Sequence, residues 1–201
     1  MTMETDVPPA APPQPGSRSI WRRMIRAARI DINLYEEVEH ESQATGQAFI
    51  VVLLVALATG IGTGLSYAMD GEVSFPFIRG LLVGLGTGIG GWLLWSLFAY
   101  WLGTTLFRGP ETEATYGQLL RTLGFANTPG LLRVFAFIPF LGGVIAFVAF
   151  VWSLVAGVIA VRQALDFSTW RAIGTCIVGW ILYLLLVMLV GVLIGGASFL
   201  F

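Results

Sequence analysis

The sequence contains four long stretches without a charged residue, and these constrain the fold more than any other feature. They cover residues 44–69, 80–107, 134–161 and 172–201. About 20 apolar residues are enough for a helix to cross a bilayer, where a helix satisfies its own backbone hydrogen bonds. The stretches therefore predict an all-α fold, a polytopic transmembrane helical bundle.

The charged residues that remain are few and unevenly placed. Charged residues make up 11% of the chain, whereas soluble domains carry about 25%. All 11 basic residues are arginine, and five of them lie between residues 18 and 29, just before the first apolar stretch. A basic cluster at this place is typical of the cytoplasmic flank of a span and of contact with anionic lipid.

The basic cluster has the pattern of an amphipathic helix. Apolar residues recur at helical spacing at Ile20, Trp21, Met24, Ile25, Ala28 and Ile32. Such a helix lies in the headgroup layer with its guanidinium groups on lipid phosphate, so we expect lipid binding by Arg22, Arg23, Arg26 and Arg29. Nucleic acid is not expected as a partner, because an acidic run follows at once, with Glu36, Glu37, Glu39 and Glu41.

Three regions are expected along the chain. Residues 1–16 hold five of the nine prolines and predict a disordered tail. Residues 17–43 form a cytoplasmic amphipathic helix and an acidic linker, whose charges at residues 31–41 are expected to be mostly solvated. Residues 44–201 form the transmembrane domain.

The number of crossings depends on residues 119–141, which are interrupted at Asn127-Thr128-Pro129. If this segment is a broken span, five spans are expected, at about residues 48–68, 77–106, 119–141, 144–161 and 172–198. Five spans put eight arginines on the side of the amino terminus and only Arg79 on the other, whereas the four-span alternative gives eight and three. Since basic residues accumulate in the cytoplasm, five spans are favoured, with the amino terminus cytoplasmic and the carboxyl terminus outside.

Glycines at spacings of four residues are expected to pack helices closely in lipid. They are Gly60, Gly64, Gly80, Gly84, Gly88, Gly191 and Gly195. The partner helix is either in the same chain or in a second copy. The run at residues 84–91 (GLGTGIGG) formally contains a dinucleotide fingerprint, but this motif needs a soluble βαβ unit around it. No cofactor is therefore expected.

Two arginines, Arg121 and Arg133, flank the break in the third predicted span. A guanidinium near the hydrocarbon layer is costly unless it is paired or reaches the interface. Two interpretations stay open. The arginines extend to the interface, or they form a site for a lipid phosphate or a peptide acid with Tyr116 and Asn127.

The four stretches contain no Asp, Glu, Lys, Arg or His. Coupled pumps usually need an ionisable group in the bundle, and acid–base catalysis needs one in the site. The single Cys176 and single His40 also give no metal site or nucleophile–base pair. Neither an enzyme nor a metal site is therefore expected.

The order of features resembles the Yip domain family of Ypt/Rab-interacting-protein-like membrane proteins, in a bacterial-type form. The similar segments are DINLYEE (31–37), YGQLLRTLGFANTP (116–129), PFLGG (139–143), WSL (152–154) and STWRA (168–172). The resemblance implies five clustered spans and a non-enzymatic membrane role. Eukaryotic relatives bind prenylated GTPases, but arginine-only, Gly- and Ala-rich usage suggests a bacterial origin, so GTPase binding is not transferred.

The sequence thus predicts an adaptor or membrane-organising protein in the bacterial inner membrane. Expected partners are anionic lipids, an unidentified membrane or cytoplasmic protein, and a second copy of the chain. The alternative is a passive channel, carrier or lipid-translocating protein. That alternative would need a lipid-facing groove lined by Thr87, Ser96, Tyr100 and Thr104.

Overall fold

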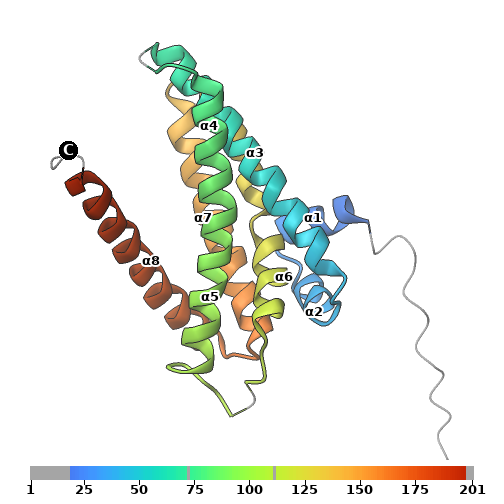
Figure 1. The fold of residues 1–201 in the computed structure, drawn as a ribbon. Coiled ribbons are helices and arrows are strands. Elements are labelled where there is room, and N and C mark those ends of the chain that lie inside the picture. Colours follow the sequence, from blue (N-terminus) through green and yellow to red (C-terminus); the bar gives the residue numbers. More distant parts are fainter. Residues whose placement is uncertain (1–18, 72, 111, 198–201) are drawn as a thin grey trace, which may run out of the picture.

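The computed structural model describes residues 19–71, 73–110 and 112–197, with side chains described as far as residue 192. The predicted disordered tail therefore lies outside the described residues. The described part is built from helices and contains no strand, which confirms the all-α prediction. Figure 1 shows the helices side by side, with the two short amino-terminal helices on one flank. The helices are α1 (Ile20–Ala28), α2 (Ile32–His40), α3 (Ala44–Asp70), α4 (Pro76–Leu85), α5 (Gly91–Thr104), α6 (Tyr116–Ala126), α7 (Leu141–Ala164) and α8 (Thr169–Ala197).

Four of these helical segments are long and apolar enough to cross a membrane, judged by length and composition within the described residues. They are Ala44–Asp70, Pro76–Thr104, Leu141–Ala164 and Thr169–Val192. The second consists of α4 and α5, joined without a break by the π-helical turn η1 (Gly86–Gly90). The protein is therefore a membrane protein with four candidate spans.

The predicted third span is a broken segment rather than a span-length helix. It consists of α6 and the 3₁₀ helix η2 (Thr128–Phe135), and Pro129 at the junction lacks the N–H that a continuing α-helix would use. The segment runs parallel to α3. Gly124 lies against Ala48, and Gly130 lies against Val55. The Arg133 carbonyl lies next to Gly62, so the broken segment accompanies α3 along much of its length.

The most extensive helix contact joins α3 to α4. A Cβ added to Gly60 would lie 2.9 Å from the Leu81 Cα, and one added to Gly80 would lie 2.5 Å from the Gly60 carbonyl oxygen. Gly64, Gly84 and Gly88 have similarly close neighbours on the opposing helix. Gly191 has no neighbour within 4 Å, and Gly195 lies beyond the described side chains. The α3–α4 backbones thus approach where glycine allows it.

The acidic segment is not a solvated link but the helix α2. Asp31 caps it, because its side chain accepts a hydrogen bond from the Asn33 N–H. Apolar residues of both amino-terminal helices, such as Met24, Leu34 and Val38, are buried against α3 and Phe125. We call α1 and α2 together the amino-terminal helix pair.

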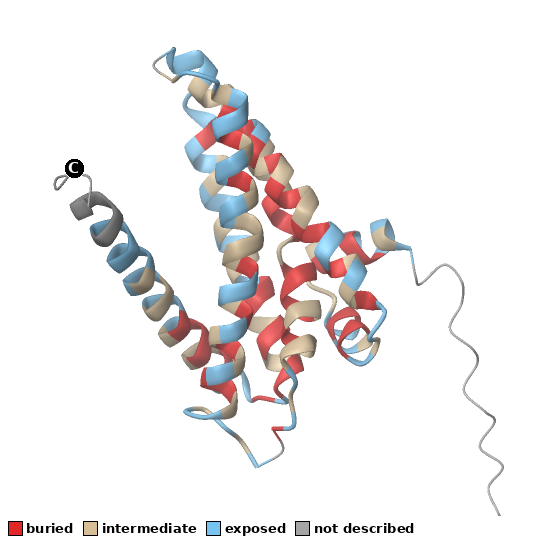
Figure 2. Cartoon of the chain, viewed as in Figure 1, coloured by how far each residue is buried: buried red, intermediate tan, exposed pale blue. Residues whose placement is uncertain are grey.

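The last helix, α8, and the second candidate span are the least covered of the described spans. Figure 2 shows mostly exposed residues on the part of the second half of α8 whose burial is described, and Figure 1 shows α8 diverging from the other helices toward the carboxyl end. Its first half packs on α5, with Gly179 against Trp95 and Leu102. The exposed fraction is 57% for Leu185 and 67% for Met188.

Candidate functional site

The amino-terminal helix pair is held together by buried ion pairs. The Arg23 side chain is only 1% exposed. Its Nη2 donates to Glu37 Oε1 at 2.7 Å and also to the Glu41 carboxylate, while its Nη1 donates to Gln47 Oε1 at 2.9 Å. Arg26 donates to Asp31 at 2.7 Å and to Glu37 at 2.6 Å. Both arginines therefore point toward the protein.

These contacts keep Asp31 and Glu37 ionised at neutral pH. The hydrogen bond from Arg26 lowers the pKa of Asp31 below its ordinary value. Burial alone would raise the pKa of Glu37, but hydrogen bonds from Arg26 and Arg23 outweigh it and the pKa is lowered. A carboxylate that accepts such charge-assisted bonds favours its charged form.

The outer face of α1 is left exposed. Trp21 is 62% exposed and Ile25 is 54% exposed, and Arg22 and Arg29 lie beside them on the surface. Of the four arginines predicted to bind lipid, only these two are free to reach a headgroup. Arg23 and Arg26 are instead occupied by their contacts with carboxylates and, for Arg23, with the Gln47 amide.

Arg121 fastens α6 to α2. Its Nε donates to the Val38 carbonyl at 3.0 Å, and its Nη2 donates to the Glu39 carbonyl at 2.5 Å. Glu39 is only 4% exposed and accepts a hydrogen bond from Gln118 Nε2 at 3.0 Å. Burial raises the pKa of Glu39 to about 7, although His40 and Arg121 oppose this rise.

The other members of the predicted four-residue site also separate. The Tyr116 hydroxyl donates to the Leu93 carbonyl of α5 at 2.9 Å, and Tyr116 is not among the residues that line a cavity with Arg133. Only Asn127 and Arg133 line a common cavity. The structure thus divides the predicted site into a contact at α2 and a cavity between the spans.

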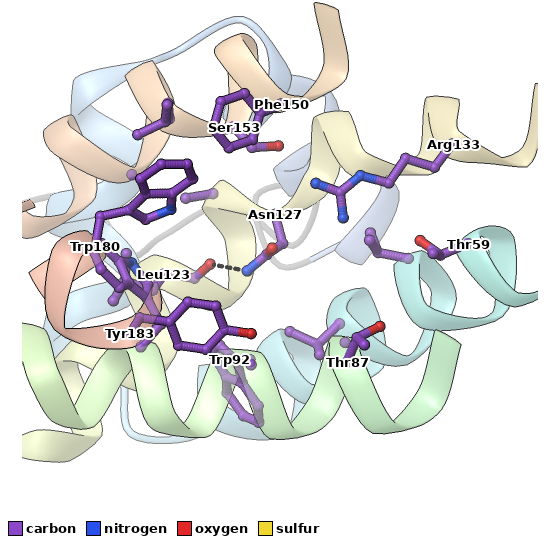
Figure 3. Close-up of a pocket in the computed structure, with 18 of the residues that line it drawn as sticks. Thr59, Thr87, Trp92, Leu123, Asn127, Arg133, Phe150, Ser153, Trp180 and Tyr183 are labelled. Atoms are coloured by element: carbon purple, nitrogen blue, oxygen red, sulfur yellow. Dashed lines mark hydrogen bonds between the residues drawn. The ribbon is translucent and has the colours of Figure 1, made fainter. Parts of the chain in front are cut away.

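The cavity has a volume of about 280 Å³ and lies among α3, α5, α7, α8 and the broken segment. Trp92, Trp95, Phe150 and Trp180 form much of its wall. Figure 3 shows the Arg133 guanidinium pointing into the cavity, toward Asn127. Among the described residues, Arg133 is the only charged residue that lines it.

The polar groups of the cavity are incompletely paired. Within the described part of the chain, the Arg133 guanidinium has no hydrogen bond or ion pair, and the buried Ser153 hydroxyl oxygen has no partner. Asn127 donates to the Leu123 carbonyl at 2.8 Å, which leaves its side-chain oxygen free to accept. A cation and a hydroxyl that lack partners can together hold an anion.

Sequence reasoning missed Ser153, Trp180 and Tyr183 as cavity residues. They lie in charge-free spans, far along the chain from Arg133, and no spacing motif connects them. Of the four residues expected to line a groove in a carrier, Thr87 lines this cavity. The Thr87 and Thr104 hydroxyls donate to the Val83 and Tyr100 carbonyls of their own helices. Among the described residues, no cluster of His, Cys, Asp or Glu could hold a metal ion.

The family model of the Yip1 domain matches residues 33–196. No curated protein matches the chain, and no solved structure matches it.

Proposed function

Because the chain belongs to the Yip1 domain family, whose members are generally non-enzymatic membrane proteins, we propose that it acts as a membrane-organising adaptor. In this role the amino-terminal helix pair is a platform on the anionic leaflet of the membrane. The spans anchor this platform, and an associated protein partner is recruited beside it.

One observation carries the proposal: the amino-terminal helix pair is fixed to the spans while one face of α1 stays exposed. Ion pairs of Arg23 join α1 to α2, and Arg121 joins α2 to α6. Trp152 Nε1 of α7 donates to the Ala28 carbonyl of α1 at 2.8 Å. A fixed platform with an apolar and basic outer face matches the chemistry of an anionic membrane surface.

The test places an environment-sensitive fluorophore on α1. Trp21→Cys is labelled in a Cys176→Ser background, and the protein is put into nanodiscs of phosphatidylglycerol or phosphatidylcholine. Emission should shift to the blue only in the anionic nanodiscs. The double variant Arg22→Gln, Arg29→Gln should remove the shift, since each arginine near an anionic surface contributes about 1 kcal/mol.

The matched control removes the same charge elsewhere. Arg79→Gln with Arg108→Gln changes two exposed arginines outside α1 and should leave the shift intact. Equal emission in both lipids, or an equal loss in the control, would contradict the platform.

We further propose five crossings, with the broken segment as the third, a cytoplasmic amino terminus and an outside carboxyl terminus in a bacterial inner membrane. The course of the broken segment along α3 supports this topology, as does the distribution of arginines. A reporter enzyme fused after Phe201 should be active outside the cytoplasm. Cytoplasmic activity there would rule out an odd number of crossings.

The cavity favours a second candidate, a passive carrier or lipid-translocating protein. Reconstituted vesicles separate the two functions. The adaptor predicts no solute flux or lipid scrambling above empty vesicles, together with one protein partner captured by crosslinking in native membranes. Flux or scrambling that disappears when the cavity is filled by Gly157→Leu would favour the carrier.

A further inference from the structure

The cavity lies at the level of the apolar spans rather than at a polar end of the molecule. Four candidate spans contribute to its lining, for example Val55 of α3 and Phe150 of α7. The Arg133 backbone lies against Gly62, which is inside the candidate span Ala44–Asp70. The side chain points from there into the cavity (Figure 3).

The charge at this place lacks a counter-charge. Arginine stays protonated in proteins, and a guanidinium within the spans is costly unless it is paired or solvated. The described part of the cavity wall contains no Asp or Glu. Within the described residues, the cavity wall therefore supplies no negative charge to balance Arg133.

The unpaired groups define what kind of group fits. Arg133 offers several N–H donors in a planar fork, which matches the oxygens of a carboxylate or a phosphate. The Ser153 hydroxyl, buried and unpartnered, can donate to the same oxygens. Both groups therefore select an oxyanion.

The walls define what the oxyanion is attached to. Trp92, Trp95, Phe150 and Trp180 present aromatic surface to the cavity, and such surface suits a hydrocarbon chain. The cavity is smaller than the roughly 300–1,000 Å³ of typical ligand pockets, so it holds a headgroup and the first part of one chain.

The rest of the hydrocarbon chain can leave the cavity beside α8. Tyr183 of α8 lines the cavity, and the residues of α8 directly after it are exposed, with Leu185 57% and Val187 50% exposed. Figure 2 shows this exposed half of α8 diverging from the other helices. A lipid tail can leave the cavity along this surface and enter the bilayer.

We infer that the cavity binds an anionic amphiphile, with its carboxylate or phosphate on Arg133 and Ser153 and its hydrocarbon chain between the aromatic walls and α8. This site goes beyond the proposed platform and is independent of it. The fluorescence shift of the α1 label should stay the same when the cavity is emptied, so the two proposals can fail separately.

Native mass spectrometry of the full chain in a non-ionic detergent tests the site. The purified protein should retain a bound mass that corresponds to a fatty acid or to a phospholipid, and the mass shows which source supplies the oxyanion. Arg133→Leu should lose this adduct. Arg79→Leu, an exposed arginine on α4, should keep it.

Delipidated protein is then titrated with oleate, 1-oleoyl-lysophosphatidate, oleyl alcohol or inorganic phosphate. At least one of the two anionic amphiphiles should bind, and Arg133→Leu should weaken that binding about tenfold or more, as expected for a lost charged hydrogen bond. Oleyl alcohol should bind wild type no better than Arg133→Leu. Inorganic phosphate alone should not bind measurably, because it lacks the chain.

A second variant keeps the test decisive if Arg133→Leu fails to fold. Gly157 lines the cavity, and a Cβ there has its nearest neighbour at 4.0 Å, so Gly157→Leu should fold and fill the cavity. It should prevent binding while Arg133 is still present. The inference would be overturned if the purified protein carried no adduct and bound neither anionic probe, and water would then surround Arg133. Unchanged binding in the folded variants would also overturn it.

Discussion

Arg23 in the amino-terminal helix pair and Arg133 in the cavity are both shielded arginines, yet their surroundings differ. Arg23 contacts Glu37, Glu41 and Gln47, so the chain supplies all its partners. Arg133 has neither a hydrogen bond nor an ion pair within the described residues. An arginine that is paired within the chain therefore holds the fold together, whereas one left unpaired points to a ligand.

The largest effect is expected from removing the paired arginine. Arg23→Leu leaves the carboxylates of Glu37 and Glu41 without their partner in a partly buried place. Breaking a buried pair by removing one partner costs about 3–5 kcal/mol, and the exposure of the two carboxylates puts the expected loss at the lower end. Unfolding in a titration with sodium dodecyl sulfate measures it.

The control for this variant is Arg22→Leu, because Arg22 is the exposed neighbour on the same helix. Its free energy of unfolding should change by about 0.5 kcal/mol or less. Equal effects of the two variants would show that the pairing of Arg23 does not stabilise the fold.

The next effect concerns Glu39, a buried carboxyl whose pKa is raised to about 7. A raised pKa means that the folded state binds the proton more tightly than the unfolded chain. The stabilisation is therefore complete below the ordinary pKa of 4.5 and is lost as the pH rises through about 7. The expected loss between these limits is about 1–3 kcal/mol.

Glu39→Gln removes this titration but keeps an acceptor for Gln118. The variant should be more stable than wild type at pH 8 and should show a flatter dependence of unfolding free energy on pH between 5 and 8. Parallel pH profiles for both proteins would show that Glu39 is not the titrating group. Glu39 thus differs from Glu37: it is buried and accepts a hydrogen bond from Gln118, but it forms no ion pair among the described residues.

A smaller effect is expected from the bond between α7 and α1. Trp152→Phe removes the donor to the Ala28 carbonyl at 2.8 Å, which should cost about 1 kcal/mol. Amide hydrogen exchange in α1 should become faster, because α1 loses a tie to the spans. Trp170→Phe, at a site that is 82% exposed, should leave this exchange unchanged, and equal exchange in wild type and Trp152→Phe would contradict the fixed platform.

The sequence was sufficient for α1 and the long helical segments, but not for α2 or for the roles of individual arginines. Charge-free stretches predicted the four long helices, and Asn127-Thr128-Pro129 predicted the break after α6. The basic stripe predicted α1, but it could not separate Arg23 from Arg22, because burial depends on where α2 folds back. The spacing of Glu37 and Glu41, one helical turn apart, was the available signal for α2 as the partner of α1.

The cavity could be predicted only in part. Arg133 and Asn127 stood out because charged and amide groups are rare near apolar segments. Ser153 and Tyr183 gave no signal, since single hydroxyl residues in spans usually donate to their own helix. Their place in the wall of the same cavity as Arg133 depends on the packing of α7 and α8, which no local pattern specifies.

The central claim is that Arg133 serves a ligand rather than the fold. Its most direct test is the thermal unfolding midpoint of delipidated Arg133→Leu and delipidated wild type, each with and without the anionic amphiphile that binds wild type. Removing an unpaired charge should leave the midpoint equal or higher, and the amphiphile should raise the midpoint of wild type alone. A large loss of stability in Arg133→Leu, comparable to that of Arg23→Leu, or an equal shift by the amphiphile in both proteins, would contradict the claim.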